Sequence, residues 1–551
     1  VRRTLLCETL RPRFGRASSG IALTCALLWM VHPMLTECVN YISQRTESIM
    51  GLFYLLTLYC AIRAIGSDHR YRWHAASVFS CALGMASKEV MVTAPLMVLL
   101  YDLAFRSGSI RQVLRQRRGL YAGLAATWLV LAVLMWSAPR SSTVGFSHGV
   151  SASEYAMIQC VVIVHYLRLA VWPHPLVLDY GFPQVLPIHE VAPYAAFLAA
   201  LVLATIAAFV YRPMIGFLGA WIFVILSPTS SFIPIATEVG AERRMYLSLA
   251  GLIVLIVIAG YVLLKRAGRQ LGARGPTKAG WTGAGLIIVV AAVLIGATVG
   301  RNHDYRSPIS IWQTVVQGAP RNPRGYNELG NALQLQGEFH EAISHYRHAI
   351  LIKPDYVEAH NNLGTVLWLQ GKLDEAISHY RQALKVKPDY ALAHNNLGNV
   401  LQLQDKLDEA IHHYRQALRI KPGLAGTYSN LGIVLQLQGK LDEAIHHYRE
   451  ALRIKPDFAV AHSNLGEALS AQGKFDEAIR HYRQALRIKP DLAEAHNSLG
   501  DALRAQGKLD EAISHYRRAL EIKPDYAAAV QNLTDAQQMK SQQRNQTPTI
   551  P

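Results

Sequence analysis

The sequence predicts an all-α protein of two unlike parts: a polytopic α-helical membrane domain over residues 20–300 and an α-solenoid of helix pairs over residues 323–526. Apolar runs of about membrane-helix length recur through the first part. The second part is polar and repeats itself every 34 residues, which indicates stacked helical units. The other segments are a basic stretch, 1–19, a linker with a capping helix, 301–322, and a capping helix with a disordered tail, 527–551, in which the tail is residues 537–551.

Nine or ten apolar runs predict the membrane helices. Several are shorter than the roughly 20 residues that a helix needs to cross a hydrocarbon core of about 30 Å, so the turns beside them must dip into the membrane or tilt. One run, 154–172, contains His165 and Arg168 and ends at Trp172-Pro173, which is compatible with a re-entrant or interfacial helix. The runs lie near 20–31, 49–65, 73–87, 90–105, 119–138, 154–172, 191–211, 214–233, 246–264 and 281–300.

Basic loops predict the orientation. The formal charge of +17 suggests nucleic acid at first sight, but many Arg and Lys residues cluster in short loops between apolar runs, as in the cytoplasmic loops of membrane proteins. We therefore assign the loops 63–72, 106–118 and 265–278, with the turn at Arg212, to the cytoplasm and expect no nucleic-acid partner. This assignment predicts a multi-pass membrane protein whose repeats, with residues 31–48, lie on the non-cytoplasmic face.

Three polar turns share that predicted face. Ionisable groups are costly inside a bilayer and mark functional cavities by default. For each turn alone, anchoring at the membrane interface is a sufficient explanation; the three together favour a polar cavity. The candidate cavity residues are His32, Glu37, Arg45, Glu47, Lys88, Glu89, Glu242, Arg243 and Arg244.

The second part consists of six repeat units. Small residues recur where two helices cross and Pro follows the second helix, which is the tetratricopeptide pattern. A stacked array of such units leaves a groove, lined by the first helices, that binds extended protein. The recurring glycines are Gly330, Gly364, Gly398, Gly432, Gly466 and Gly500.

Motifs in the polar turns resemble one family. HPMLTE (32–37) and RTES (45–48), then SKE (87–89) ahead of Tyr101-Asp102, then AERRMYL (241–247) resemble the transmembrane-and-tetratricopeptide protein O-mannosyltransferases. These are polytopic glycosyltransferases of the GT-C superfamily. The loop Leu178-Asp179-Tyr180 is similar to an external loop of the same family.

The resemblance implies transfer of a mannose-like sugar from a polyprenyl-phosphate carrier to Ser or Thr hydroxyls on the non-cytoplasmic face. The lipid-linked sugar is a substrate, no cofactor is implied, and a divalent metal stays open. Arg and Lys suit phosphate binding. The implied phosphate ligands are Arg45, Lys88, Arg243 and Arg244, and the groups that orient them or contact sugar are His32, Glu37, Glu47, Glu89 and Glu242.

The resemblance also implies acidic residues in a first external loop, after the first membrane helix. The sequence opens with Val1, and residues 1–19 offer only Glu8. We therefore expect the catalytic Asp to lie upstream of Val1 in a longer protein, and we assign no catalytic residue within the sequence.

Asparagine recurs two residues before the repeat glycine. One amide offers both a donor and an acceptor, so a ladder of them could hydrogen-bond a peptide main chain. The pattern resembles the repeat domain of the O-GlcNAc transferases, although solvated asparagines would give the same pattern. The candidate peptide-binding residues are Asn362, Asn396, Asn430 and Asn464.

Histidine and cysteine predict no metal site. The histidines from His345 to His515 recur at 34-residue spacing, and residues on separate units do not converge on one ion. A solvated face of the second helices is the better interpretation. The six cysteines all lie within the first 160 residues, mostly in or beside apolar runs and without a CxxC, so they indicate neither a metal site nor a disulfide framework.

Two functions remain open at this stage. The first is a membrane glycosyltransferase whose repeats recruit acceptor proteins. The alternative is a non-catalytic, membrane-anchored scaffold that assembles partner proteins. A transporter fits less well, because the sequence lacks a pair of interrupted helices in corresponding halves.

Overall fold

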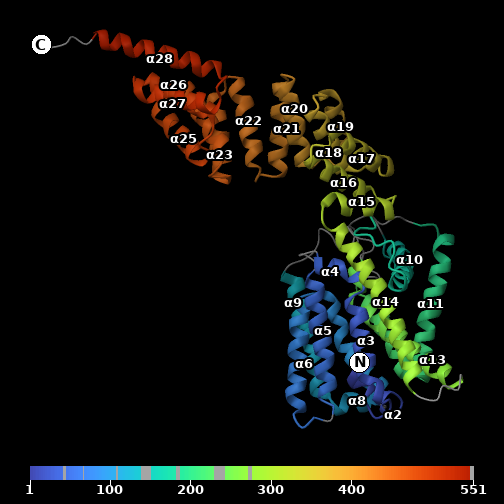
Figure 1. Cartoon of the computed structure of the whole chain (residues 1–551). Coiled ribbons are helices and arrows are strands. Elements are labelled where there is room, and N and C mark those ends of the chain that lie inside the picture. Colours follow the sequence, from blue (N-terminus) through green and yellow to red (C-terminus); the bar gives the residue numbers. More distant parts are fainter. Residues whose placement is uncertain are drawn as a thin grey trace. The chain divides into compact units, whose positions relative to one another are not determined.

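The computed structural model describes residues 1–40, 45–65, 67–106, 109–137, 151–181, 186–228, 242–270 and 276–546. Every regular element in these ranges is helical, which confirms the predicted all-α class. The chain divides into two compact units, 1–332 and 333–551, whose helices are labelled in Figure 1.

A helix forms over each predicted apolar run of the first unit. The long apolar helices are α3 (Ser18–Met30), α5 (Arg45–Arg63), α6 (Arg70–Met85), α7 (Ala94–Arg106), α9 (Arg118–Ser137), α10 (Ala152–Val171), α11 (Ile188–Tyr211), α12 (Pro213–Leu226), α13 (Tyr246–Gln270) and α14 (Pro276–Asp304). Short helices connect them: α1 (Arg2–Leu5), α2 (Arg11–Phe14), η1 (Gly15–Ala17), η2 (Pro33–Leu35), α4 (Thr36–Asn40), η4 (Glu89–Thr93), α8 (Ile110–Gln116), η6 (Glu242–Met245) and α15 (Pro308–Gly318).

Length and hydropathy identify the membrane spans. Among the described residues, five helices are long and apolar enough to cross a bilayer, and a sixth span results if Glu89–Arg106 and Ile110–Gln116 are one span bent by 110°. In α11 the 18-residue apolar stretch that marks the span has no buried residue, as expected of a helix that faces lipid. The protein is therefore a multi-pass membrane protein. The path of α10 and the count of nine or ten crossings stay predictions.

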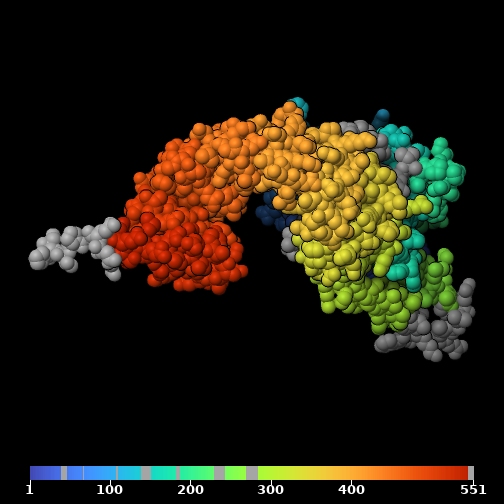
Figure 2. Space-filling view, turned by 90° about the horizontal axis from the view of Figure 1, so that it is seen from above, coloured from blue at the N-terminus to red at the C-terminus, as the bar shows by residue number. Residues whose placement is uncertain are grey.

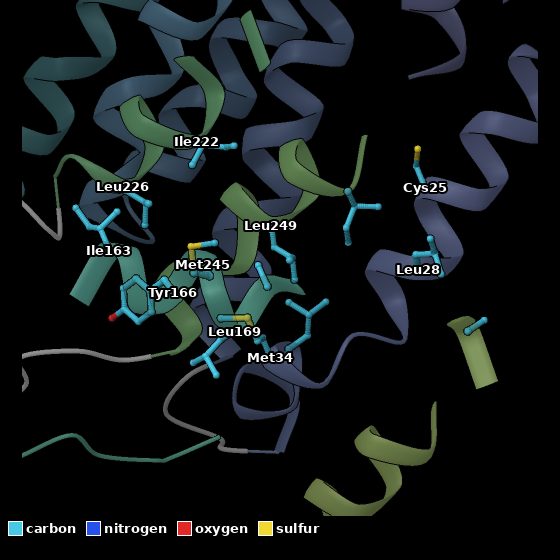
Figure 3. Close-up of a cluster of buried hydrophobic side chains, with 14 of the residues drawn as sticks. Cys25, Leu28, Met34, Ile163, Tyr166, Leu169, Ile222, Leu226, Met245 and Leu249 are labelled. Atoms are coloured by element: carbon cyan, nitrogen blue, oxygen red, sulfur yellow. The ribbon is translucent and has the colours of Figure 1, made fainter. Parts of the chain in front are cut away.

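The helices of the first unit pack around shared apolar clusters. One joins α3, α10, α12 and α13 through Leu28, Tyr166, Leu226 and Leu249, all at most 9% exposed (Figure 3). Met34 of η2 belongs to the same cluster. This packing fixes the turn that follows α3, which carries the first group of candidate residues.

Gly51 of α5 allows a close approach at the edge of those turns. A Cβ atom added there would stand 2.4 Å from Cε1 of Tyr246, the first residue of α13. A side chain would therefore push α5 away from α13. The glycine keeps the turn before α5 beside the turn before α13.

The segment between the two predicted parts differs from the expected linker. Helix α14 continues through Asp304, so Arg301 belongs to its last turn. Ser307 then starts α15 with a capping box, in which its hydroxyl accepts a hydrogen bond from the N–H of Ser310. Hydropathy falls at residue 301, but helix formation does not stop there, because polar residues at a membrane surface continue a helix as readily as apolar ones.

The second part forms the predicted helix pairs. The first helices of the six repeats are α16 (Pro323–Leu335), α18 (Val357–Leu369), α20 (Ala391–Leu403), α22 (Ala425–Leu437), α24 (Ala459–Ala471) and α26 (Ala493–Ala505). The second helices are α17 (Phe339–Ile352), α19 (Leu373–Val386), α21 (Leu407–Ile420), α23 (Leu441–Ile454), α25 (Phe475–Ile488) and α27 (Leu509–Ile522).

The repeat glycines and tyrosines form the helix crossings. A Cβ on Gly364 would lie 2.8 Å from Cε1 of Tyr380, which is fully buried, and the four repeats that follow have the same arrangement. Successive first helices contact each other more closely than successive second helices do. The first helices therefore line the inner side of a curved array, and Figure 2 shows the hollow that the later repeats surround.

Two predictions for the repeats were wrong. The tail 537–551 was expected to be disordered, but α28 (Ala527–Gln546) runs well into it. Helix α28 packs on the last repeat, where Ala529 and Ala536 are buried and Lys540 pairs with Asp510. Residues 547–551 lie outside the described part of the chain.

The repeat histidines are half-buried and paired, not solvated. In four repeats, Nδ1 of a first-helix histidine lies 2.9–3.1 Å from Nδ1 of the second-helix histidine 19 residues later. Nε2 of the first-helix ring faces the carbonyl of the preceding proline at 3.0–3.1 Å and must donate to it. Its Nδ1 is therefore an acceptor for the second ring. The pairs are His360–His379, His394–His413, His462–His481 and His496–His515.

Candidate functional site

Three turns that are distant in sequence meet at one end of the membrane helices. They are the segment after α3, the turn between α6 and η4, and η6 ahead of α13. Thr298 of α14 donates a hydrogen bond to the carbonyl of Val31 at 2.7 Å, so the end of α14 joins the same group. We call the ionisable residues gathered there the charged cluster: Glu37, Glu47, Lys88, Glu242, Arg243, Arg244 and Arg301.

Glu47 and Glu37 each hold a cation from another turn. Lys88 forms an ion pair with Glu47. Arg243 Nη1 lies 2.7 Å from Glu37 Oε1, and its Nε lies 3.9 Å from Glu47 Oε1. The backbone N–H of Arg243 also donates to Glu37 at 3.3 Å. Both carboxylates are at most 3% exposed, so these charges interact in a medium that screens them far less than water.

Local structure sets the direction of these side chains. Glu37 lies in the first turn of α4, where a carboxylate suits the positive end of the helix. The hydroxyl of Thr36 donates to the carbonyl of Pro33 at 2.8 Å and fixes that turn. Lys88 has extended backbone immediately before η4, which turns its side chain away from the axis of α6.

Glu242 lies at the centre of a second group of contacts. It is 1% exposed and accepts hydrogen bonds from the backbone N–H of Val177 and, at 3.0 Å, from the hydroxyl of Tyr180. The hydroxyl of Tyr180 has one proton and donates it to Glu242. The ring nitrogen of His165, 3.2 Å away, must therefore donate to the tyrosine oxygen. Arg301 Nη2 lies 3.9 Å from the other oxygen of Glu242.

Arg301 is a cluster residue that the sequence did not indicate. It was part of the expected linker, whereas in the structure its side chain is only 4% exposed. Its Nη1 lies 3.4 Å from Asp304 and 3.4 Å from Thr314. A basic residue directly after the last apolar residue of a run is the signal that could have identified it.

Asp179, in the predicted external loop, has a structural role. Its carboxylate accepts the N–H of Gly181 at 2.7 Å and pairs with Arg324 at 3.0 Å. Asn322 donates to its backbone carbonyl at 2.8 Å. These bonds attach the loop after α10 to the start of α16.

The remaining predicted cavity residues have different surroundings. His32 is 3% exposed, and its Nε2 donates to the carbonyl of Ala170 at 3.2 Å; burial lowers the pKa of His32 to about 4, so the ring is a neutral link to α10. Glu89 begins η4 beside Lys88, and Arg244 is buried in η6. The side chain of Arg45 lies outside the described residues.

The candidate asparagines connect neighbouring repeats. Asn396 donates to Asn361 at 3.1 Å, Asn430 donates to Asn399 at 2.9 Å, and Asn464 lies 3.5 Å from the hydroxyl of Ser429. All are half-buried, as is Asn362. A bound peptide would have to share these amides with the repeats, and peptide contact stays a prediction.

The charged cluster combines the groups that a transfer from a phosphate carrier needs. Cations stabilise a leaving phosphate, and carboxylates orient those cations or accept a proton. Within the described ranges, no group of three or more His, Cys, Asp or Glu residues is placed to hold a metal ion.

Fold and site together define a class: a multi-pass membrane protein with a charged cluster at the helix ends and a tetratricopeptide array. The tetratricopeptide repeat family matches windows that span 323–525. The dolichyl-phosphate-mannose-protein mannosyltransferase family matches residues 3–136, which include Glu37, Glu47 and Lys88.

The curated relatives to which the chain is similar are protein O-mannosyl-transferases. The chain is 25% identical over 391 residues to the Drosophila melanogaster protein O-mannosyl-transferase Tmtc3, which covers 61% of this chain and 41% of the relative. It is 25% identical over 371 residues to the Mus musculus protein O-mannosyl-transferase TMTC4, covering 59% and 48%. The chain thus spans about half or less of their length, and it is a distant relative of these protein O-mannosyltransferases.

Solved structures of other proteins are similar to about a third of this chain. The crystal structure of MamA is 28% identical and covers 30% of this chain and 97% of its own, with a TM-score of 0.28. That of PilW, a type IV pilus biogenesis factor, is 20% identical and covers 38% and 98%, with a TM-score of 0.36.

Proposed function

We propose that this protein transfers a mannose-like sugar from a polyprenyl phosphate to Ser or Thr hydroxyls of proteins that its repeats recruit. The observation that carries the proposal is the convergence of three distant turns in one buried, ion-paired cluster at the ends of the membrane helices. The family match over 3–136 and the names of the relatives support the same reaction.

The reaction requires one bond to form and one to break. The acceptor oxygen attacks the anomeric carbon of the sugar, the bond from that carbon to the phosphate oxygen breaks, and the polyprenyl phosphate leaves. A carboxylate accepts the proton of the hydroxyl. In this proposal the cluster cations stabilise the leaving phosphate, Glu37 and Glu47 hold two of those cations in place, and the proton acceptor is left unassigned.

Lys88→Ala tests the role of the cluster. With the full-length protein in lipid nanodiscs and a radiolabelled mannosyl phosphate lipid, we expect transfer to an acceptor protein to fall at least about 100-fold, the loss typical of a removed oxyanion donor. Membrane insertion should be unchanged. Lys265→Ala, at an exposed position near the C-terminal end of α13, is the control. Wild-type transfer by the Lys88 variant would contradict the proposed role.

Recruitment by the repeats has a separate test. Replacing Asn362, Asn396, Asn430 and Asn464 together with Ala should weaken acceptor binding and leave the helical content of the array intact. The matched control replaces four exposed second-helix residues that also share one register position: Ser378, His412, His446 and Arg480. Equal affinity of both variants would show that the asparagines only join the repeats.

A non-catalytic scaffold is the second candidate. It is favoured by the ion pairs themselves, since Lys88 and Arg243 already have carboxylate partners within the chain. Binding of acceptor proteins with no sugar transfer by the full-length wild type would support the scaffold. We further propose that the repeats and the cluster share the non-cytoplasmic side, which cysteine-accessibility labelling at exposed Ser378 and in the loop at Ser67 tests: the two should react from opposite sides.

A further inference from the structure

The contacts that Arg301 makes with acceptor groups in and near the charged cluster are long. Its Nη1 contacts, at 3.4 Å, and its distance of 3.9 Å from Glu242 exceed the roughly 2.7–2.9 Å of a charge-assisted hydrogen bond. In the described part of the chain, Nε and Nη2 have no hydrogen-bond partner although both atoms are buried. The guanidinium therefore keeps donors on two of its nitrogens.

Two other cluster cations, Lys88 and Arg243, differ in this respect. Lys88 contacts Glu47 directly, and Arg243 makes a 2.7 Å bond to Glu37. A phosphate that bound either cation would compete with a buried carboxylate already in contact. Arg301 could bind a new acceptor without breaking a short ion pair.

Glu242 does not depend on Arg301 for its hydrogen bonds. Val177 and Tyr180 both donate to Oε1, whereas the long contact to Arg301 involves Oε2. Movement of the guanidinium toward a ligand would leave that carboxylate bonded. Glu242 therefore orients Arg301 without neutralising it at short range.

A neighbouring hydroxyl adds a further donor. Arg301 stacks on the ring of Tyr305, with its Cζ 5.2 Å from the ring centroid. Among the described residues, the buried hydroxyl of Tyr305 has no partner either. Buried polar groups nearly always have a hydrogen-bond partner, so a guanidinium edge and a phenol without one indicate a ligand rich in acceptor oxygens.

We propose that Arg301 and Tyr305 bind the phosphoryl group of the polyprenyl-phosphate donor. The planar guanidinium can donate to two phosphate oxygens at once, and Tyr305 can donate to the same group. Arg301 lies in the last turn of the candidate span Gly283–Asp304, and a span ends at the depth of lipid head groups. That the lipid is a polyprenyl phosphate rests on the proposed function. That the site binds a phosphoryl group rests on the contacts of Arg301 and Tyr305 alone.

Binding of sugar-free lipids tests the site. The full-length protein in phosphatidylcholine nanodiscs is titrated with polyprenyl monophosphate, phosphatidic acid or inorganic phosphate, and the melting temperature is recorded. We expect polyprenyl monophosphate to stabilise the wild type. Arg301→Gln should weaken this binding at least about tenfold, as removal of a charged, two-bond contact does. Arg301→Lys and Tyr305→Phe should each weaken it less.

Arg324→Gln is the matched control, because Arg324 also pairs with a buried carboxylate but lies outside the cluster. It should bind polyprenyl monophosphate as the wild type does. Binding to Arg301→Gln and Tyr305→Phe at wild-type strength would overturn the proposal, and so would equal stabilisation by phosphatidic acid or inorganic phosphate. Arg301-dependent binding without sugar transfer would refute the proposed function and leave this site standing. Undiminished sugar transfer by Arg301→Gln would support the proposed function and refute this phosphoryl site.

Discussion

The charged cluster and the repeat array use the same pairs of side chains in opposite surroundings. In the cluster, Arg243 and Glu37 are 11% and 2% exposed and lie 2.7 Å apart. In the array, Arg415 and Glu443 join adjacent second helices at 3.4 Å, with 58% and 52% of their side chains exposed. Burial makes an ion pair expensive to break, whereas water and salt replace an exposed pair at little cost.

The largest expected effect is at Arg243. Arg243→Ala leaves the buried carboxylate of Glu37 without the guanidinium that contacts it at 2.7 Å. This should lower the free energy of unfolding by about 3–5 kcal/mol, and sugar transfer should be lost as well. We expect a marked drop in melting temperature in nanodiscs. The double variant Glu37→Gln/Arg243→Gln removes both charges and should recover most of that stability without recovering transfer. A stable and active Arg243→Ala protein would show that the buried ion pair is no more costly to break than an exposed pair of the array.

A packing change in the array gives the next largest effect. A Cβ on Gly398 would lie 2.7 Å from Cε1 of the fully buried Tyr414. Gly398→Ala should therefore destabilise the array by about 1–3 kcal/mol through overpacking. Gly423→Ala, where a Cβ has open space, is the control. Denaturant unfolding followed by circular dichroism measures both, and equal stability would show that the helix crossing adapts.

Sequence reasoning succeeded for features that the repeat period and the apolar runs determine, and it failed for contacts that depend on which side chains meet. The 34-residue period determined the helix pairs from Pro323 onward, because every unit buries the same Gly and Tyr. The grouping of Lys88 with the turns at 37–47 and 242–244 followed from counting membrane crossings. Arg301 was missed because the sequence shows only where hydropathy drops. Hydropathy drops in the same way whether the helix ends there or continues for a further polar turn. The histidine pairs were missed because the two rings belong to different helices.

The third prediction concerns pH in the array. Burial, followed by the nearby charges of His394, His412 and Arg381, lowers the pKa of His413 to about 4. Between pH 6.5 and about 4 the unfolded chain thus binds more protons at this site than the folded chain, so stability falls as pH falls through that window. The pKa of His481 is also lowered to about 4, by burial first and then by His462, Arg449 and Arg480, while Glu477 opposes the shift.

His413→Gln should make the melting temperature less dependent on pH across that window. His412→Gln is the control, since His412 is the exposed neighbour. Melting curves of the full-length protein between pH 4 and 7, with the array transition followed by circular dichroism, give the two slopes. A steeper slope for the His413 variant would show that the ring pair takes up a proton readily and does not oppose folding at low pH.

The smallest effect is expected at Arg415, in the exposed Arg415–Glu443 ion pair of the array. Arg415→Ala removes an exposed pair whose two side chains are more than half accessible to water, so the array should lose less than about 0.5 kcal/mol, and less still in high salt. The same truncation at Arg243 should be several times more damaging, although both replace an Arg that contacts a Glu of another helix. Equal losses at the two positions would mean that water reaches the charged cluster. The cluster could then no longer act as the weakly screened environment in which its cations stabilise a leaving phosphate.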